Sequence, residues 1–197
     1  QAPAANVEWE KYPWQSDILH FARLLGSVNT AQLDKARKEL KTLYALRDSL
    51  LRKDAYQANQ VAIQIKSSEA WIAFKEGKNE DALKLMTEAA VMEDNTEKHS
   101  VTPGEVLPAR ELLRDMLLQM NQPAKALEAY EASLKTHVNR FNGLYGAGLA
   151  AERSGNKAKA KQHYGQLIAI TKPSKAPRPE LQAVRTFLQS EKMVARR

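Results

Sequence analysis

The chain has 197 residues, of which 43% are hydrophobic, so it is long enough to bury a core as one domain or as two small ones. It contains no cysteine, which excludes disulfides, thiolate metal sites and cysteine nucleophiles, and no apolar run approaches the roughly 20 residues that a membrane-spanning helix needs. The net charge is +7, but the 30 basic residues are scattered among acidic ones, which is typical of the solvated faces of amphipathic helices and not of a nucleic-acid surface.

Residues 1–15 are predicted to be a flexible leader or an N-terminal cap. The chain opens with Gln1 and not with methionine, so we expect it to have been cut from a longer one, by signal-peptide removal or at an artificial boundary. Three aromatic residues, Trp9, Tyr12 and Trp14, lie outside the predicted repeats. They either fold back as a cap or mark the place where a preceding repeat docks.

The rest of the sequence predicts helices and no strands. Apolar residues recur at helical spacing, no stretch alternates with period two for long, and most of the eight glycines and eight prolines fall between the periodic stretches. The predicted helices cover residues 16–27, 31–52, 55–76, 80–93, 104–120, 123–136, 141–154, 157–171 and 179–192.

Several helix ends carry their own signals. Gly77 and Gly155 follow helical stretches where a left-handed C-terminal cap favours glycine. We expect the asparagines just after them, Asn79 and Asn156, to cap the next helices. The sequence Thr102-Pro-Gly-Glu105 has the form of a capping box and predicts the start of the fifth helix. Prolines at the first helical position open the sixth and ninth helices, namely Pro123 and Pro179.

The second helix of each predicted pair repeats one pattern, a small residue followed four positions later by a large apolar one. The alanine lets two helix backbones approach closely, and the large residue fills the space beside that contact. Two of these alanines, Ala126 and Ala160, are 34 residues apart. The pattern occurs as Ala36 with Leu40, Ala82 with Met86, Ala126 with Tyr130, and Ala160 with Tyr164.

These co-registered pairs resemble the tetratricopeptide repeat family. The best match is residues 139–172, with Gly148 at the family's glycine position in the first helix and Gly155 in the turn. The preceding unit departs from the pattern because Arg114 takes that glycine position. The resemblance implies an all-α, right-handed superhelix of antiparallel helix pairs that occupies residues 16–172. Its parts are a degenerate pair at 16–52, repeats at about 55–94, 104–138 and 139–172, and a C-terminal capping helix at 179–193.

Two stretches, residues 97–113 and His20-Phe-Ala-Arg23, are similar to the C-terminal part of uncharacterised bacterial tetratricopeptide proteins in which further repeats precede. The similarity implies that the chain is one end of a longer bacterial array. Together with the leader, it favours the periplasm or cell envelope over the cytoplasm.

The sequence predicts no catalytic residue, no cofactor and no metal site, so we expect the protein not to be an enzyme. The histidines lack partners at metal-ligand spacing. Three glycines, Gly143, Gly146 and Gly148, lie in a helical pattern without a preceding strand, so close helix packing explains them better than phosphate binding does. The four histidines are His20, His99, His137 and His163.

The family resemblance implies a concave surface, lined by the first helices of successive pairs, that binds a protein or peptide. Core packing is an alternative role for Trp71 and Phe74. Chaperone-binding members carry lysine, arginine and asparagine at positions that are acidic or apolar here, so we expect a basic, partly apolar peptide instead of a terminal carboxylate. The candidate groove residues are Ser67, Trp71, Phe74, Glu111, Asp115, Leu118, Tyr145, Leu149 and Glu152.

Two other functions stay open at this stage. The chain is an architectural end segment of a longer repeat protein if an apolar patch is exposed around the N-terminal aromatic residues. An RNA-binding helical repeat would need its basic side chains to converge on one face, with binding that weakens steeply with salt.

Overall fold

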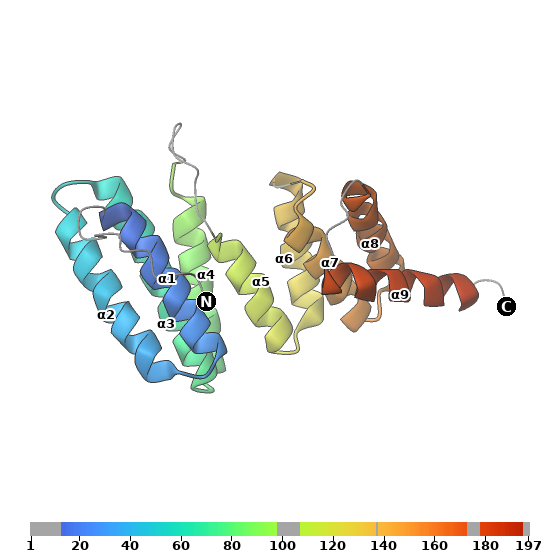
Figure 1. The fold of residues 1–197 in the computed structure, drawn as a ribbon, viewed down its shortest axis with the longest axis horizontal. Coiled ribbons are helices and arrows are strands. Elements are labelled where there is room, and N and C mark those ends of the chain that lie inside the picture. The colour runs from blue at the N-terminus through green and yellow to red at the C-terminus, as the bar shows by residue number, and fades with distance from the viewer. Residues whose placement is uncertain (1–12, 98–106, 137, 173–177, 195–197) are drawn as a thin grey trace. The chain divides into compact units, whose positions relative to one another are not determined.

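The computed structural model describes residues 13–97, 107–136, 138–172 and 178–194, and within these ranges the chain forms nine α-helices and no strand (Figure 1). The prediction of an all-helical chain is therefore confirmed over the described residues. The helices are α1 (Pro13–Asn29), α2 (Leu33–Leu50), α3 (Ala55–Lys75), α4 (Asn79–Asp94), α5 (Ala109–Gln119), α6 (Pro123–Thr136), α7 (Phe141–Arg153), α8 (Lys157–Thr171) and α9 (Pro179–Val194).

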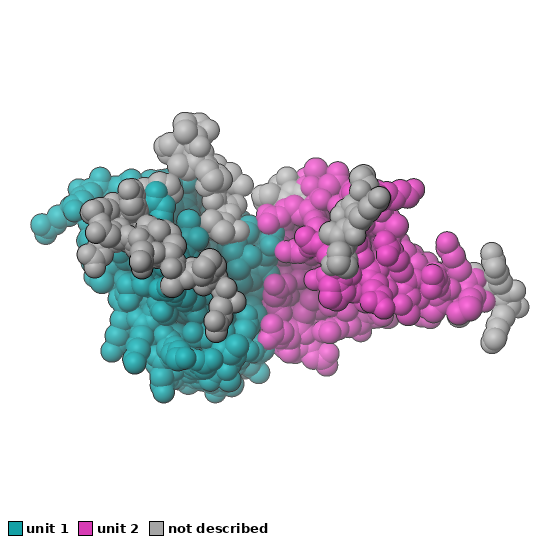
Figure 2. Space-filling model, in the orientation of Figure 1, with its two compact units in different colours: residues 1–113 teal, residues 114–197 magenta. Residues whose placement is uncertain are grey.

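The chain divides into two compact units, residues 1–113 and 114–197, which Figure 2 colours separately. In the first unit α1 packs against α2, α2 against α3, and α3 against α4, and α1 also packs against α3. In the second unit α6 packs against α7, α7 against α8, and α8 against α9. The boundary falls within α5, inside the predicted repeat 104–138.

The fifth helix begins later than the sequence predicted, at Ala109 and not at residue 104. The helical conformation is disfavoured for the residue before Pro108, because its backbone would clash with the proline ring. The backbone N–H of Ala109 then donates to Oε2 of Glu93 on α4 at 2.5 Å, which satisfies one of the free donors at the helix start. The predicted capping box at residues 102–105 lies outside the described residues.

The turn inside each helix pair has the same backbone geometry. The N–H of Gly77 donates to the carbonyl of Phe74 and the next N–H, of Lys78, donates to Ala73, which is the Schellman arrangement of a helix C-terminus. The equivalent bonds close the turns after α1, α5 and α7. One residue of each turn has a positive φ, namely Ala31 (58°), Gly77 (81°), Asn121 (55°) and Gly155 (79°).

In the second and fourth pairs, the N-cap position of the helix after the turn is taken by the residue that directly follows the left-handed one. The side chain of Asn156 holds that position and accepts from the N–H of Lys159 at 3.1 Å, as predicted. In the second pair the same position is occupied by Lys78, which makes no side-chain cap. The prediction that Asn79 caps α4 is wrong, because Asn79 comes one residue later and lies inside the helix.

The small-then-large pattern marks one packing position in all four pairs. Its alanine lies five residues after the left-handed turn residue and is fully buried every time. Four positions later Met86, Tyr130 and Tyr164 are also buried, whereas Leu40 is only half-buried. The four alanines, each with 0% exposure, are Ala36, Ala82, Ala126 and Ala160.

The glycines of α7 allow two tyrosine rings to press against its backbone. A Cβ on Gly146 would lie 2.2 Å from Cζ of Tyr130, which comes from α6. A Cβ on Gly148 would lie 2.2 Å from Cε1 of Tyr164, which comes from α8. The interpretation of these glycines as packing residues is confirmed, because real Cβ atoms do not approach other atoms so closely.

In the preceding pair the position equivalent to Gly148 holds Arg114, the departure noted in the sequence. The side chain of Arg114 is 2% exposed, and its guanidinium lies 4.6 Å from the centre of the Tyr130 ring. A planar cation over an aromatic face is a favourable contact. Gly148 leaves room for the ring of Tyr164. At the equivalent position of the preceding pair, the guanidinium of Arg114 lies over the ring of Tyr130.

The last helix, α9, covers the apolar side of α8. Leu181 and Val184 are buried, and the ring of Phe187 meets that of Tyr164 edge to face at 5.2 Å between centroids. Glu191 forms ion pairs with two lysines of α8. These contacts cover apolar side chains of α8 that would otherwise be exposed.

We expect Gly148→Ala to lower the free energy of unfolding by about 1–3 kcal/mol, because the new methyl group forces the buried ring of Tyr164 to move. The control is Gly165→Ala on α8, where no atom lies within 4 Å of the added Cβ. That substitution should raise stability by about 0.5–1 kcal/mol through helix propensity alone. Urea unfolding followed by circular dichroism measures both, and equal effects of the two variants would contradict the packing described.

The common turn geometry makes a second prediction. Ala31 carries a side chain in a left-handed conformation that glycine adopts without strain, so Ala31→Gly should stabilise the fold by about 0.5–1 kcal/mol. The reverse change at the equivalent position, Gly77→Ala, should destabilise it by about 1 kcal/mol. Thermal unfolding of both variants tests the equivalence, and effects of the same sign would disprove it.

Candidate functional site

Three of the predicted groove residues form an accessible stripe along α7. Tyr145, Leu149 and Glu152 are spaced at i, i+4 and i+7, which places them on one face of the helix. Tyr145 and Leu149 are half-buried and Glu152 is exposed. The centre of the Tyr145 ring lies 6.4 Å from that of the Tyr164 ring, at an interplanar angle of 33°. The half-buried Tyr145 thus packs on a buried ring of α8.

Buried tyrosines hold two of the candidate carboxylates. The hydroxyl of Tyr164 donates to Oε2 of Glu152 at 2.8 Å, and that of Tyr130 donates to Oδ1 of Asp115 at 2.6 Å. Both carboxylate residues remain exposed, while both tyrosines are buried. Each tyrosine therefore orients an accessible negative charge on the first helix of its own pair.

The pKa of the Tyr164 hydroxyl is raised well above its usual range, first by burial and then by the hydrogen bond to Glu152. The hydroxyl therefore stays protonated at physiological pH and acts as a hydrogen-bond donor. It is not suited to serve as a base.

The other predicted groove residues are largely covered. Trp71 is 4% exposed and meets the half-buried ring of Phe74 edge to face at 5.8 Å between centroids, which agrees with the alternative of core packing for Trp71. Three more are buried, namely Ser67, Glu111 and Leu118.

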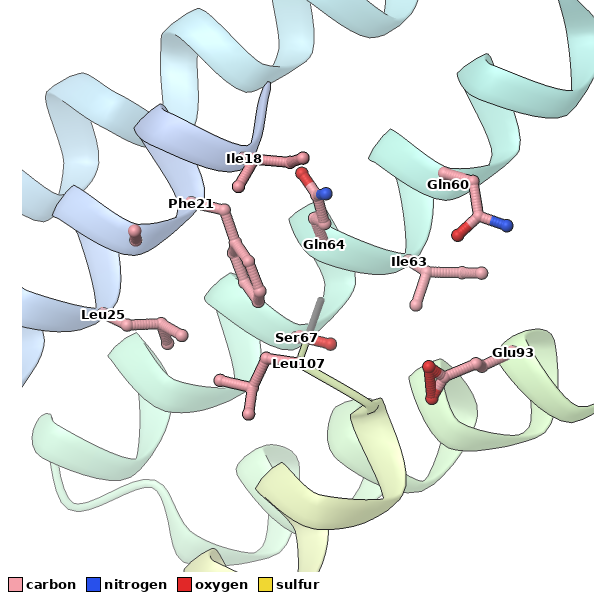
Figure 3. A pocket seen from close by; sticks show the side chains of 10 residues that line it. Ile18, Phe21, Leu25, Gln60, Ile63, Gln64, Ser67, Glu93 and Leu107 are labelled. Carbon is pink, nitrogen blue, oxygen red and sulfur yellow. The ribbon is translucent and has the colours of Figure 1, made fainter. Parts of the chain in front are cut away.

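The first unit contains a pocket of about 160 Å³ that the sequence did not predict (Figure 3). Side chains from α1, α3 and α4 surround it, together with Leu107, and the carboxylate of Glu93 lies on the α4 side. Of the predicted groove residues only Ser67 lines it. The lining residues are Ile18, Phe21, Ala22, Leu25, Gln60, Ile63, Gln64, Ser67, Glu93 and Leu107.

Two polar residues that line the pocket, Gln64 and Glu93, are held in place by hydrogen bonds. Nε2 of Gln64 donates to Oδ2 of Asp17 at 3.1 Å, which fixes the orientation of the amide. Its other atom, Oε1, is buried and has no hydrogen-bond partner among the described residues. Glu93 is held by the N–H of Ala109. The pocket therefore combines apolar walls with oriented oxygen atoms.

Asp17 is the buried residue that accepts the hydrogen bond from the Gln64 amide. It is 2% exposed, and burial raises its pKa from 3.8 to about 6, against the lowering effect of the hydrogen bonds from the Ile18 N–H and Gln64. No motif in the sequence marks this cluster, because its members come from separate helices and have no characteristic spacing.

The described residues form neither a metal cluster nor a membrane-spanning helix. Within the described ranges, no group of three or more His, Asp or Glu side chains is placed to hold a metal ion. His20 contacts Glu39, and His163 contacts Glu131, whereas the other two histidines lie outside the described residues. None of the described helices is both long and apolar enough to cross a bilayer.

Comparison with known proteins adds no family to this picture. No protein-family model matches the sequence, and no curated protein matches it. The assignment of function therefore depends on the geometry of the described residues and on the repeat pattern.

The buried carboxyl of Asp17 makes stability depend on pH. Between pH 3.8 and about 6 the folded protein keeps a proton that the unfolded chain has lost, so the contribution of Asp17 to stability decreases as the pH rises through this window. We expect Asp17→Asn to remove this dependence and to be more stable than the parent at about pH 8, by about 1–3 kcal/mol.

Urea unfolding at several pH values measures this effect. Asp34→Asn serves as the control because that side chain is 96% exposed. Parallel pH profiles for the parent and Asp17→Asn would show that the carboxyl is not destabilised by burial.

Proposed function

We propose that this chain is a tetratricopeptide-type scaffold that binds a polypeptide partner. The observation that supports it best is the geometry shared by four helix pairs, in which a left-handed turn residue precedes a fully buried alanine by five positions. A fold built from such pairs places first helices next to one another and gives an extended surface for a partner.

The α7 stripe has the chemistry for a basic, partly apolar peptide. Tyr145 and Leu149 offer apolar area, and Glu152 offers a charge that Tyr164 already holds in place. A pre-oriented carboxylate loses little side-chain freedom when a ligand binds, which favours affinity. Aromatic residues with one polar end are common in binding surfaces for the same reason.

We propose a non-enzymatic role. The described carboxylates at the candidate surface are engaged by tyrosine hydroxyls in a structural arrangement, as in the pair of Tyr130 with Asp115. A general base needs a pKa near the operating pH and access to a substrate proton. The raised pKa of Tyr164 does not suit that task.

The basic residues of α8 do not favour the RNA-binding alternative. Lys157 and Lys161 form ion pairs with Glu191 at 3.1 and 3.0 Å, and Lys159 pairs with Glu131 at 2.6 Å. Their charges are thus offset locally. The architectural alternative depends on Trp9, Tyr12 and Trp14, of which the first two and the side chain of the third lie outside the described part of the chain.

The proposal is tested by selecting peptides from a random phage-displayed library on the intact chain and measuring their affinities by calorimetry. We expect the selected peptides to be rich in lysine, arginine and apolar residues. Glu152→Lys should weaken their binding about tenfold or more, because it replaces the charge that attracts them.

Two further variants serve as controls for this test. Glu128→Lys makes the same charge change at an exposed position of α6 and should alter affinity by less than about twofold. Glu152→Gln keeps an acceptor for Tyr164 and should give an intermediate loss. The proposal is wrong if no peptide binds saturably or if the Glu128 and Glu152 reversals have equal effects.

A further inference from the structure

We propose that a hollow where α1 ends and α2 begins binds a doubly charged phosphate group. Its lining residues come from the last two turns of α1, from the short connection and from the first two turns of α2, and we call it the basic hollow. The inference concerns the first unit alone and does not depend on the proposed scaffold function.

Three cationic side chains line the basic hollow. Arg23 comes from α1, whereas Lys35 and Lys38 are spaced at i and i+3 on one face of α2. All three are exposed, and none forms an ion pair or a hydrogen bond with another described residue. Like charges at this spacing repel each other, so an anion between them would relieve an unfavourable interaction.

The nearest acidic residue in the chain does not neutralise these cations. Asp34 precedes Lys35 directly, but its Oδ1 lies 3.1 Å from Nη1 of Arg37. Arg37 also pairs with Glu76 of the connection after α3, at 2.6 Å. Neither Asp34 nor Arg37 lines the basic hollow, so this ion-pair network leaves its charge in place.

One carboxylate does line the basic hollow. Glu39 is half-buried, and its Oε2 lies 2.5 Å from Nδ1 of His20. Three positive charges against this one negative charge leave the lining with a net charge of +2. A phosphate monoester matches that value, because it carries about −1.5 to −2 charges at neutral pH.

Neutral donors are present beside the cations. Ser27 lines the basic hollow, and its Oγ makes no hydrogen bond with another described residue. The hydroxyl of Thr30 is already used, because it donates to the carbonyl of Gly26 at 2.9 Å. Nε2 of Gln32 donates to that hydroxyl and keeps a second N–H. Cations and neutral donors together suit the several acceptor oxygens of a phosphate.

The basic hollow has room for such a group. Its volume is about 350 Å³ and it is open to solvent, so a phosphate can enter together with the group that carries it. The planar guanidinium of Arg23 can bind two phosphate oxygens, and the flexible stems of the lysines allow their ammonium groups to follow.

Other ligand chemistries fit less well. No aromatic residue is among the described residues that line the basic hollow, so a nucleotide base has no ring on which to stack. A nucleic-acid backbone phosphate and a carboxylate each carry a single charge, which leaves part of the positive charge without compensation. A metal ion would be repelled by the three cations.

The test titrates a capped phosphoserine, N-acetyl-phosphoserine amide, into the intact ¹⁵N-labelled protein and follows the chemical shifts. At about pH 7.5 this probe is a dianion, because its second pKa is near 6. Dimethyl phosphate and acetate serve as singly charged probes. We expect saturable shifts with phosphoserine at roughly millimolar concentration, and at least about fivefold weaker binding of the singly charged probes.

Inorganic phosphate distinguishes the two sources of the group. Tighter binding of phosphoserine indicates a phosphorylated polypeptide, and equal binding indicates free phosphate. Both results support the site.

Variants locate the binding. Arg23→Gln together with Lys38→Gln removes two of the cations and should weaken phosphoserine binding at least about tenfold. The matched control is Arg52→Gln with Lys84→Gln, which removes the same charges at exposed positions elsewhere in the first unit and should change affinity by less than about twofold. Circular dichroism checks that both variants keep their helices.

A change of the opposite sign is expected at the carboxylate. Glu39→Gln keeps an acceptor for His20 and should tighten phosphoserine binding about twofold or more. Equal binding of dimethyl phosphate, which would point to a nucleic-acid backbone, overturns the proposal. So does the absence of saturation, or an equal effect of the two double variants.

Discussion

The close approach of two helices at a buried alanine is the contact on which the rest of this structure depends. Each pair turns through a residue with positive φ, and the alanine five positions later has no exposed surface. Any larger side chain at Ala82 or Ala160 would push the helices apart. A fully buried alanine follows the left-handed turn residue by five positions in all four turns, so the same local rule recurs along the chain.

In the second unit the packing contacts and the candidate binding surface share residues. Tyr164 presses on the backbone at Gly148 and, with its hydroxyl, holds the carboxylate of Glu152. Tyr130 does the same with Gly146 and Asp115. The buried rings thus position the exposed charges, so the core restricts the motion of the candidate surface.

The first unit uses a different arrangement, in which polar side chains line a hollow that packing leaves open. Gln64 is oriented by the buried Asp17, and its remaining oxygen faces no partner among the described residues. Leaving such an atom unsatisfied costs stability in a folded protein.

The sequence alone determined the local features, because these depend on residues close together in the chain. Helical spacing and the glycines at 77 and 155 placed most helix ends within a few residues, and the alanine pattern identified the packing positions. The sequence did not predict the left-handed conformation of Ala31, because alanine has no preference for a positive φ. Only the tertiary structure buried Trp71 and brought Phe21, Gln64 and Glu93 around one pocket, because contacts between separate helices depend on how whole surfaces pack.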